Sequence, residues 1–317
     1  MTSRNPAPDY AIRVSDLQKI YRASGKMPEK HALKGISLDI PRGSIFGLLG
    51  PNGAGKSTFI NILAGLVNKT SGSASIWGLD IDEYPRQSRA AIGVVNQEIV
   101  ADPFFTPLEM LELMAGFYGV PKSERRSIEI LTAVGLDDKK DAYVRQLSGG
   151  MKRRLMVAKA LVHNPPVLIL DEPTAGVDVE LRRSLWEYVR ELHANGTTII
   201  LTTHYLEEAE ELCDSIAIVN HGEIVACEPT PKLLARLDYK TLVITPKDPL
   251  TAVPDALSSL DASIRPDGDL AITYRTSETG IGRLLELVRS AGVGVADLVT
   301  EAPDLEDVFI SLTSEPA

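Results

Sequence analysis

The chain has 317 residues, enough for two domains or one large one, and 44% of them are hydrophobic, which excludes disorder as its main state. Its 33 basic and 43 acidic side chains give a net charge of −10, so it lacks the broad positive field of non-specific nucleic-acid binders, and we expect no nucleic-acid partner. Two cysteines exclude a disulfide framework, and no run of 18 apolar residues predicts a membrane span. These features are typical of a cytoplasmic protein.

The N-terminal part is predicted to begin as a tail and to continue as short strands. Residues 1–9 are polar, include two prolines and lack the apolar segment of a secretory signal, so we expect a flexible tail. Alternating apolar residues at 11–17, 35–40 and 44–49 predict strands. The apolar period becomes helical over residues 55–67.

The middle of the chain predicts a helical region and then the buried strands of an α/β core. Residues 100–164 are mostly helical in pattern, and one helix begins with a capping box at Thr106. The uninterrupted apolar run 167–170 predicts a strand that is covered on both faces, and residues 197–202 predict another buried strand after an intervening helix. We therefore expect an α/β domain over residues 10–234, with a helical subdomain inside it.

Residues 235–317 differ in character and predict a small second domain of the α+β type. The pattern predicts three strands at 241–245, 269–274 and 293–300, and two helices at 280–291 and 305–313. This part of the sequence carries no motif that indicates chemistry. We expect it either to regulate the first domain or to contribute a dimer contact.

The strongest signal of chemistry is a glycine-rich loop between a predicted strand and a predicted helix. It matches the pattern G-x-x-x-x-G-K-[ST] and consists of Gly50, Pro51, Asn52, Gly53, Ala54, Gly55, Lys56 and Ser57. Glycines let backbone N–H groups surround an anion, and the helix N-terminus adds partial positive charge. We predict that this loop binds nucleotide phosphates, with Lys56 reaching the β- and γ-phosphates and Ser57 ligating Mg²⁺.

Two carboxylates follow the buried strand at residues 167–170. An apolar strand that ends in paired acids can place one carboxylate on a metal ion and the other near an attacking water. We predict that Asp171 acts on Mg²⁺, directly or through a water ligand, and that Glu172 orients or deprotonates the water. Acidic residues at strand ends are common on surfaces, so this prediction depends on the phosphate loop upstream.

A third motif, Leu-Ser-Gly-Gly at residues 147–150, distinguishes between nucleotide-binding families. Taken alone it is also compatible with an ordinary helix N-cap, although N–H groups at a helix start suit an anion as well. The order of phosphate loop, Leu-Ser-Gly-Gly and apolar strand with two acids resembles the nucleotide-binding domain of an ABC ATPase. The resemblance covers about residues 10–228, and a P-loop kinase or GTPase does not explain the third motif.

The resemblance implies a site for ATP and Mg²⁺ with further residues. Tyr21 resembles the aromatic side chain that stacks on adenine, Gln97 the glutamine that senses Mg²⁺ and the membrane partner, and His204 the histidine that contacts the γ-phosphate. Asn96 stands where the family often has proline, and Ala175 replaces the more usual serine of the loop that crosses the dimer interface. The resemblance implies that Glu172, His204 and Lys56 are catalytic and that Gln97 is a metal ligand together with Ser57 and Asp171. It also implies that the nucleotide contacts of the phosphate loop extend to Thr58. A second subunit would contribute its Ser148, Gly149 and Gly150 to the same nucleotide.

A finer resemblance is to the ATP-binding subunits of ABC-2 type exporters. It rests on Met151 in place of a common glutamine, on the segment 204–210 and on the segment 305–309 near the end of the second domain. It implies an ATPase that forms a head-to-tail dimer, with a homodimer favoured, and that powers a separate membrane permease. The apolar residues of the helical region 104–118 exceed one narrow stripe, so we predict that this region contacts the permease; the alternative is that they only pack against the core. We expect such a protein at the cytoplasmic face of the cell membrane, as a peripheral subunit.

Two alternatives are compatible with the sequence. Soluble ABC ATPases of translation usually carry two cassettes and those of DNA maintenance carry long coiled coils, whereas this chain has one phosphate loop and no sustained heptads. An importer ATPase is distinguished only by the resemblance of the second domain to the exporter branch. The exported substrate is not encoded in these motifs, because specificity would lie mostly in the permease.

Overall fold

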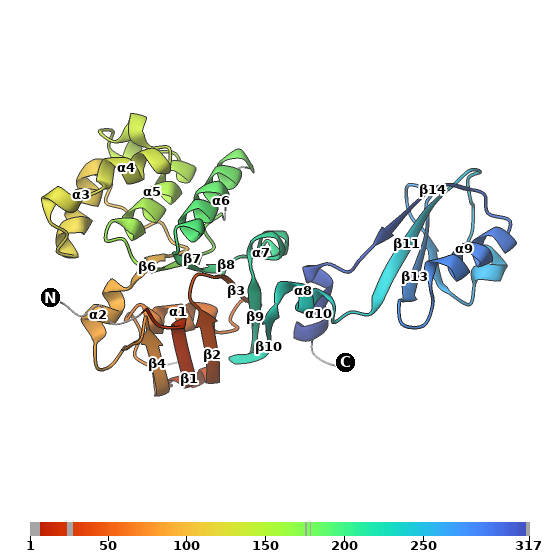
Figure 1. Ribbon diagram of the computed structural model, residues 1–317, viewed down its shortest axis with the longest axis horizontal. Helices are drawn as coiled ribbons and strands as arrows, with labels where there is room; N and C mark the ends of the chain where they lie inside the picture. Colours follow the sequence, from red (N-terminus) through yellow and green to blue (C-terminus); the bar gives the residue numbers. More distant parts are fainter. Residues whose placement is uncertain (1–6, 24–27, 175, 178, 315–317) are drawn as a thin grey trace. The chain divides into compact units, whose positions relative to one another are not determined.

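The structure is a computed structural model with two compact units, Met1–Thr230 and Pro231–Ala317 (Figure 1). The sequence places the boundary after residue 234, whereas the contacts divide the chain slightly earlier. Thr230 stays with the first unit because its N–H donates to the carbonyl oxygen of Asp214 at 3.0 Å. The described residues are 7–23, 28–174, 176–177 and 179–314, so most of the predicted tail lies outside them.

The first unit begins with an antiparallel sheet in the order β2-β1-β4-β5. Its strands are β1 (Tyr10–Tyr21), β2 (Lys30–Pro41), β4 (Ser71–Ile76) and β5 (Leu79–Asp80). Val14 and Leu38 pair across β1 and β2 and are both buried, whereas polar neighbours are exposed, as in a sheet with one solvated face. Both strands are longer than predicted because they pair to their ends, with Tyr21 opposite Lys30.

A second sheet has six strands in the order β10-β9-β3-β8-β7-β6. The strands are β3 (Ile45–Leu49), β6 (Ile92–Val95), β7 (Val167–Asp171), β8 (Thr198–Thr202), β9 (Ser215–Asn220) and β10 (Glu223–Pro229). Every residue of β3, β7 and β8 is buried, which confirms the prediction of strands covered on both faces. All but β10 run parallel, so their carboxyl ends lie along the same edge of the sheet.

Helices follow most of these strands. They are α1 (Lys56–Leu63), α2 (Pro85–Ala90), α3 (Pro107–Phe117), α4 (Ser127–Ala133), α5 (Gly149–Leu161), α6 (Val179–Ala194), α7 (Leu206–Leu212) and α8 (Thr230–Leu234). Three of them, α3, α4 and α5, contact one another and form the predicted helical region (Figure 1). The predicted capping box of α3 is confirmed, because Glu109 N donates to Thr106 Oγ1 and Thr106 N donates to the Glu109 carboxylate. In the described part of the chain, no helix combines the length and apolar character that a membrane span requires.

The second unit is built on an antiparallel sheet in the order β12-β13-β11-β14. Its elements are β11 (Tyr239–Pro246), β12 (Asp261–Ile264), β13 (Leu270–Arg275), α9 (Ile281–Ser290), β14 (Val295–Glu301) and α10 (Leu305–Thr313). Leu284 and Val288 of α9 pack against Leu242 and Ile272 of the sheet in one buried core. The three predicted strands and both predicted helices are therefore present, and β12 is an additional strand.

Candidate functional site

The predicted phosphate loop joins β3 to α1, at the carboxyl edge of the parallel sheet. Gly50 has a φ of +156°, and a Cβ there would lie 2.1 Å from the carbonyl oxygen of Val219. Gly55 has a φ of +116°, and a Cβ there would lie 2.6 Å from the carbonyl oxygen of Ala32. Any side chain at either position would collide with neighbouring backbone, so the close packing of the loop requires glycine.

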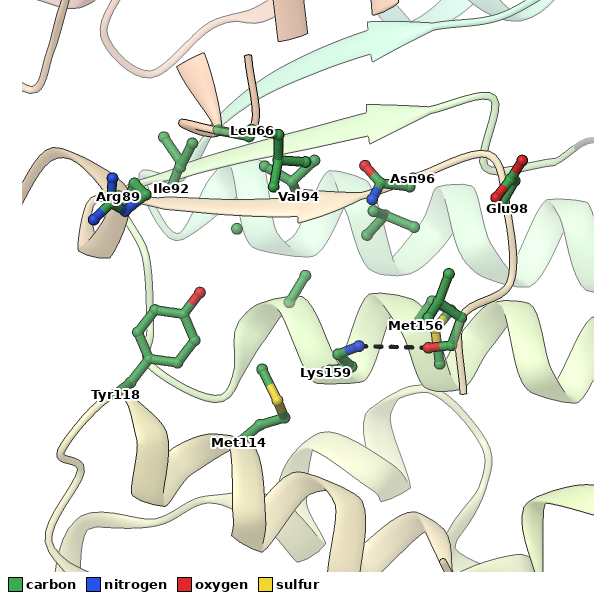
Figure 2. A pocket seen from close by; sticks show the side chains of 15 residues that line it. Leu66, Arg89, Ile92, Val94, Asn96, Glu98, Met114, Tyr118, Met156 and Lys159 are labelled. Carbon is green, nitrogen blue, oxygen red and sulfur yellow. Dashed lines mark hydrogen bonds between the residues drawn. The ribbon is translucent and has the colours of Figure 1, made fainter. Parts of the chain in front are cut away.

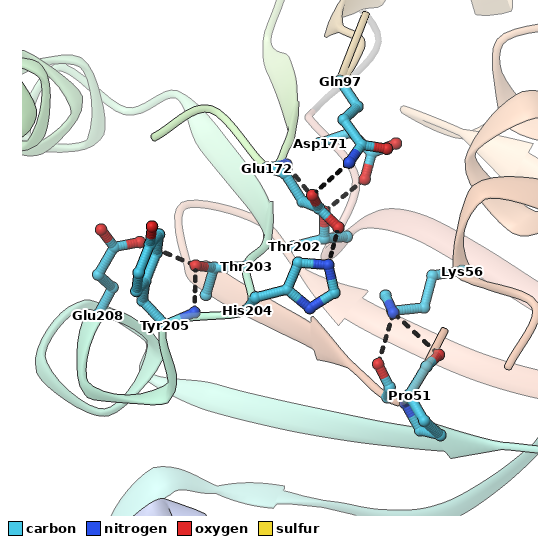
Figure 3. Close-up of polar contacts among 11 residues, drawn as sticks. Pro51, Lys56, Gln97, Asp171, Glu172, Thr202, Thr203, His204, Tyr205 and Glu208 are labelled. Carbon is cyan, nitrogen blue, oxygen red and sulfur yellow. Dashed lines mark hydrogen bonds and ion pairs between the residues drawn. The ribbon is translucent and has the colours of Figure 1, made fainter. Parts of the chain in front are cut away.

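Lys56 is the first residue of α1, and its side chain turns back into the loop (Figure 3). It is buried, and its ammonium group donates to the carbonyl oxygens of Gly50 at 2.5 Å and Pro51 at 3.2 Å. Burial lowers the pKa of Lys56, and the nearby carboxylates of Glu172 and Asp171 oppose this shift. An entering phosphate would offer this cation anionic acceptors in place of neutral carbonyls.

Asp171 and Glu172 lie at the end of β7, and a neighbouring threonine holds both. Thr202, opposite Asp171 in the sheet, donates its hydroxyl to Asp171 Oδ1 at 2.5 Å. The same residue accepts from Glu172 N, at its carbonyl oxygen (3.0 Å) and at its hydroxyl (3.1 Å). These bonds hold Glu172 in a left-handed conformation, with a φ of +50°, that is uncommon for a residue other than glycine.

The carboxylate of Glu172 lies between two side chains that the resemblance assigns to the site (Figure 3). Gln97 Nε2, just after β6, donates to Glu172 Oε2 at 2.6 Å. His204 Nε2, just after β8, lies 2.5 Å from Glu172 Oε1. Because a carboxylate only accepts, this nitrogen of His204 carries the proton. The structure thus brings together three residues from the ends of three neighbouring strands.

A cavity of about 160 Å³ opens in front of the loop. Most of the predicted nucleotide-binding residues line it, from Tyr21 on β1 to Glu172 on the opposite side. Gly50 and Pro51 take part through their carbonyl contacts with Lys56, and Asp171 lies beside Glu172 behind the cavity wall. The full lining is Tyr21, Lys30, Ala32, Asn52, Gly53, Ala54, Gly55, Lys56, Ser57, Thr58, Gln97 and Glu172.

The Leu-Ser-Gly-Gly segment belongs to another part of the unit. Ser148 caps α5 and accepts from Met151 N at 3.2 Å, so the N-cap interpretation is correct. Within the described ranges, Ser148, Gly149 and Gly150 are absent from the lining of the cavity at the phosphate loop, and the first two are exposed. In the predicted interface loop, residues 175 and 178 lie outside the described residues.

Sequence reasoning missed Thr202 and two basic residues at the site. Arg153 of α5 is buried and donates to the carbonyl oxygen of Asn96 at 2.9 Å, which holds the backbone directly before Gln97 in place of the usual proline. Lys30 lies at the cavity, at the start of β2. Only Thr202 had a usable signal, as the polar end of an apolar strand next to Asp171.

Comparisons with known proteins agree with this geometry. A model of the ABC transporter family matches residues 33–175. The daunorubicin/doxorubicin resistance ATP-binding protein DrrA of Streptomyces peucetius is 36% identical over 99% of this chain and 95% of its own. Nod factor export ATP-binding protein I of Ralstonia nicotianae is 36% identical over 90% of each chain. The linearmycin resistance ATP-binding protein LnrL of Bacillus subtilis is 36% identical over 93% of this chain and 97% of its own.

Solved structures of ABC ATP-binding subunits resemble this chain as well. An ATP-binding subunit of an ABC transporter has a TM-score of 0.64 and 30% identity, covering 71% of this chain and 92% of that one. A dimeric ATP-binding cassette in a post-hydrolysis state, bound to ADP and Pi, has a TM-score of 0.63 and 28% identity, covering 69% of this chain and 98% of that one. The chain is therefore an ATPase with the α/β P-loop fold, and it belongs to the ATP-binding subunits of ABC transporters, in the ABC-2 exporter group.

Proposed function

We propose that this chain binds ATP with Mg²⁺ between Tyr21 and Glu172 and that Glu172 is the general base of hydrolysis. The observation that carries the proposal is the Glu172 carboxylate, which is held by Gln97 on one oxygen and His204 on the other. A base must be fixed within reach of the water that it deprotonates, and two charge-assisted contacts fix it here.

The residues around the cavity take separate parts in this reaction. Tyr21 stacks on the base of ATP, and the glycine-rich loop binds the phosphates with its N–H groups. Lys56 exchanges the carbonyl oxygens of the loop for phosphate oxygens. Glu172 accepts a proton from the attacking water, and the second ring nitrogen of His204 donates to the γ-phosphate when it also carries a proton.

The donor set near the loop fits Mg²⁺. Ser57 is exposed in the cavity, and Gln97 donates its nitrogen to Glu172, which leaves its carbonyl oxygen for a cation. Asp171 adds a buried carboxylate next to them. Across the described ranges, no cluster of three His, Cys, Asp or Glu side chains could hold a metal, but Mg²⁺ at a nucleotide needs only one or two protein oxygens beside phosphates and water. When bound, it neutralises charge on the phosphates.

The site is completed by a second copy of this chain. This proposal is supported by the exposed Ser148 and Gly149, which offer helix N-terminal donors away from the cavity of their own chain. The similar cassette bound to ADP and Pi is described as dimeric. A homodimer is favoured because the phosphate loop and the Leu-Ser-Gly-Gly segment are present in one chain.

The partner of this dimer is a separate ABC-2 type permease, which places the protein at the cytoplasmic face of the membrane. A second cavity, of about 200 Å³, supports the contact that we expect through residues 104–118 (Figure 2). Met114 and Tyr118 line it from the α3 side, and Met156 and Lys159 line it from α5. Flexible methionine side chains suit the reception of a partner segment, and Asn96, directly before Gln97, also lines this cavity.

The names of the relatives support export over import. They mention resistance to daunorubicin and to linearmycin, and export of Nod factor, which are three different compounds. We therefore propose that this chain powers export and that its permease selects the substrate.

The substitution Glu172→Gln tests the role of the base. The amide can still accept one contact but cannot take a proton, so we expect the ATPase rate to fall by about 10²–10⁴-fold while ATP binding persists. The variant should elute as an ATP-bound dimer on size exclusion with Mg²⁺ and ATP. Glu207→Gln, at an exposed residue of α7, serves as the matched control. A rate close to that of the wild type would remove Glu172 from this role.

A further inference from the structure

Glu208, on α7, carries a buried carboxylate behind the ATP site (Figure 3). One of its oxygens, Oε2, accepts two hydroxyl hydrogen bonds, from Thr174 at 3.0 Å and from Thr203 at 2.9 Å. Both threonines are also buried. A buried carboxylate is costly unless it is hydrogen-bonded, so this arrangement calls for a reason beyond packing.

The two threonines belong to the two segments that carry the central pair of the site. Thr174 follows Glu172 by two residues, and Thr203 directly precedes His204. The Thr203 hydroxyl also accepts from the N–H of Tyr205 at 3.0 Å, which closes a turn around His204. Glu208 thus joins the backbone that presents Glu172 to the backbone that presents His204.

Arg182 of α6 reinforces this junction. Its Nε lies 3.4 Å from Glu208 Oε1, and its guanidinium lies over the ring of Tyr205, 4.1 Å from the ring centroid. The ion pair sets a positive charge beside the buried carboxylate that accepts from the two hydroxyls, which offsets part of the cost of burying it. The cation–π contact ties the residue after His204 to the same group.

We propose that Glu208 is a positioning residue that sets the distance between Glu172 and His204, an inference that rests on the proposed roles of these two residues. Inside the site, the Glu172 carboxylate is bonded directly to the half-exposed imidazole of His204 (Figure 3). The backbone of Glu172 is also bonded to Thr202, two residues before His204. Glu208 adds a further link from outside the site, through Thr174 and Thr203. These links together restrain how far the segment that carries Glu172 can shift relative to the segment that carries His204.

The test compares kcat and KM for ATP in Glu208→Ala and Glu208→Gln. Alanine deletes both hydroxyl bonds, and because a shift of about 1 Å can cost about 10²-fold, we expect kcat to fall by about 10- to 100-fold. KM should change by less than about threefold, because Glu208 does not line the described cavity. Glutamine keeps an oxygen that can accept both hydroxyls, so it should recover most of kcat. Glu207→Ala, exposed on the same helix, should behave like the wild type.

A second background separates positioning from general stability. In a His204→Ala chain, Glu208→Ala should lower kcat by less than about threefold further. The imidazole that Glu208 helps to position is already absent there, so its loss and the loss of Glu208 are not additive. If Glu208→Ala does not fold, Thr174→Val provides the milder test, because it removes one hydroxyl bond and should still lower kcat without raising KM.

An unchanged kcat in folded Glu208→Ala, or an equal further loss in the His204→Ala background, would overturn the inference. The failure of the inference is distinguishable from failure of the proposed function. Glu172→Gln inactive with Glu208→Ala active would contradict only the positioning role, whereas an active Glu172→Gln would contradict the function proposed for the site.

Discussion

At the scale of single residues, Glu172 combines an uncommon backbone conformation with the role that we propose for it as general base. A left-handed conformation costs about 1–3 kcal/mol for a residue other than glycine and persists only where surrounding contacts impose it. Here the two bonds from Glu172 N to Thr202 impose it. As a result, the side chain leaves β7 toward Gln97 and His204 and stays available to a water in the cavity.

Tyr21 lines the cavity with an exposed ring, and it should contribute to the binding of ATP without affecting the chemical step. Because stacking on a base contributes on the order of 1–3 kcal/mol, we expect Tyr21→Ala to raise KM for ATP by about tenfold, with kcat unchanged. Steady-state ATPase kinetics measure both constants. Tyr21→Trp should restore KM, and Tyr84→Ala, at another exposed tyrosine, is the control. An unchanged KM would show that adenine stacks elsewhere.

Lys56 illustrates a conflict between stability and function. Burial disfavours the charged form of Lys56 in the folded state and so lowers its pKa below the value of 10.5 that it has in the unfolded chain. The charge therefore destabilises the nucleotide-free protein at neutral pH, and this destabilisation is lost as the pH rises from the lowered folded pKa to 10.5. We expect Lys56→Met to raise the melting temperature without nucleotide at pH 7 and to abolish the further rise that ATP causes. Thermal melts with and without ATP measure both effects, and a lower melting temperature without nucleotide would contradict the account.

At the scale of elements, buried strands and local motifs were predictable, and tertiary contacts were not. β3 and β7 are apolar at nearly every position, so the sequence alone indicates them, whereas β6 has only four residues and no clear period. The phosphate loop is contiguous in sequence, and its assignment needed only the strand before it and the helix after it.

The remainder of the site depends on which strands become neighbours. The bond between Thr202 and Asp171 exists because β7 and β8 pair in one register. The contact of Gln97 with Glu172 requires β6 beside β7. Residue patterns do not encode strand order, so the resemblance to ABC ATPases was needed to place Gln97 and His204 in one site.

The α3 region should carry the contact with the permease. Phe117, at the end of α3, is 75% exposed, and the same region of the sequence also exposes Phe104, Leu113 and Tyr118, so it offers several large apolar side chains to a partner. We expect Phe117→Glu to reduce copurification of the permease by about tenfold or more, because it buries a charge in an apolar interface, while the ATPase rate of the isolated subunit stays normal. Pull-down from gently solubilised membranes measures the first effect. Loss of both properties would indicate misfolding, and intact copurification would move the contact elsewhere.

At the scale of the whole molecule, the two units have separate cores. Residues of β11, β13 and α9 form the core of the second unit, and the residues that line the ATP-site cavity all belong to the first. The role of the second unit, either regulation or a dimer contact, stays a prediction from the sequence. The first unit carries the phosphate loop at the cavity and the Leu-Ser-Gly-Gly segment outside the cavity lining, and we propose that these are the two halves of a shared ATP site.

Mixing two inactive variants tests this division of the site most directly. Lys56→Met disables the phosphate loop, and Ser148→Arg places a bulky cation at the capped start of α5; each alone should hydrolyse almost no ATP. In a mixed dimer, one site combines both defects and the other is intact. An equal mixture should therefore recover up to about a quarter of the wild-type rate, because about half of the dimers are mixed and each has one intact site. If two folded variants stay inactive when mixed, although each still forms dimers, the ATP site is not shared between two copies of this chain.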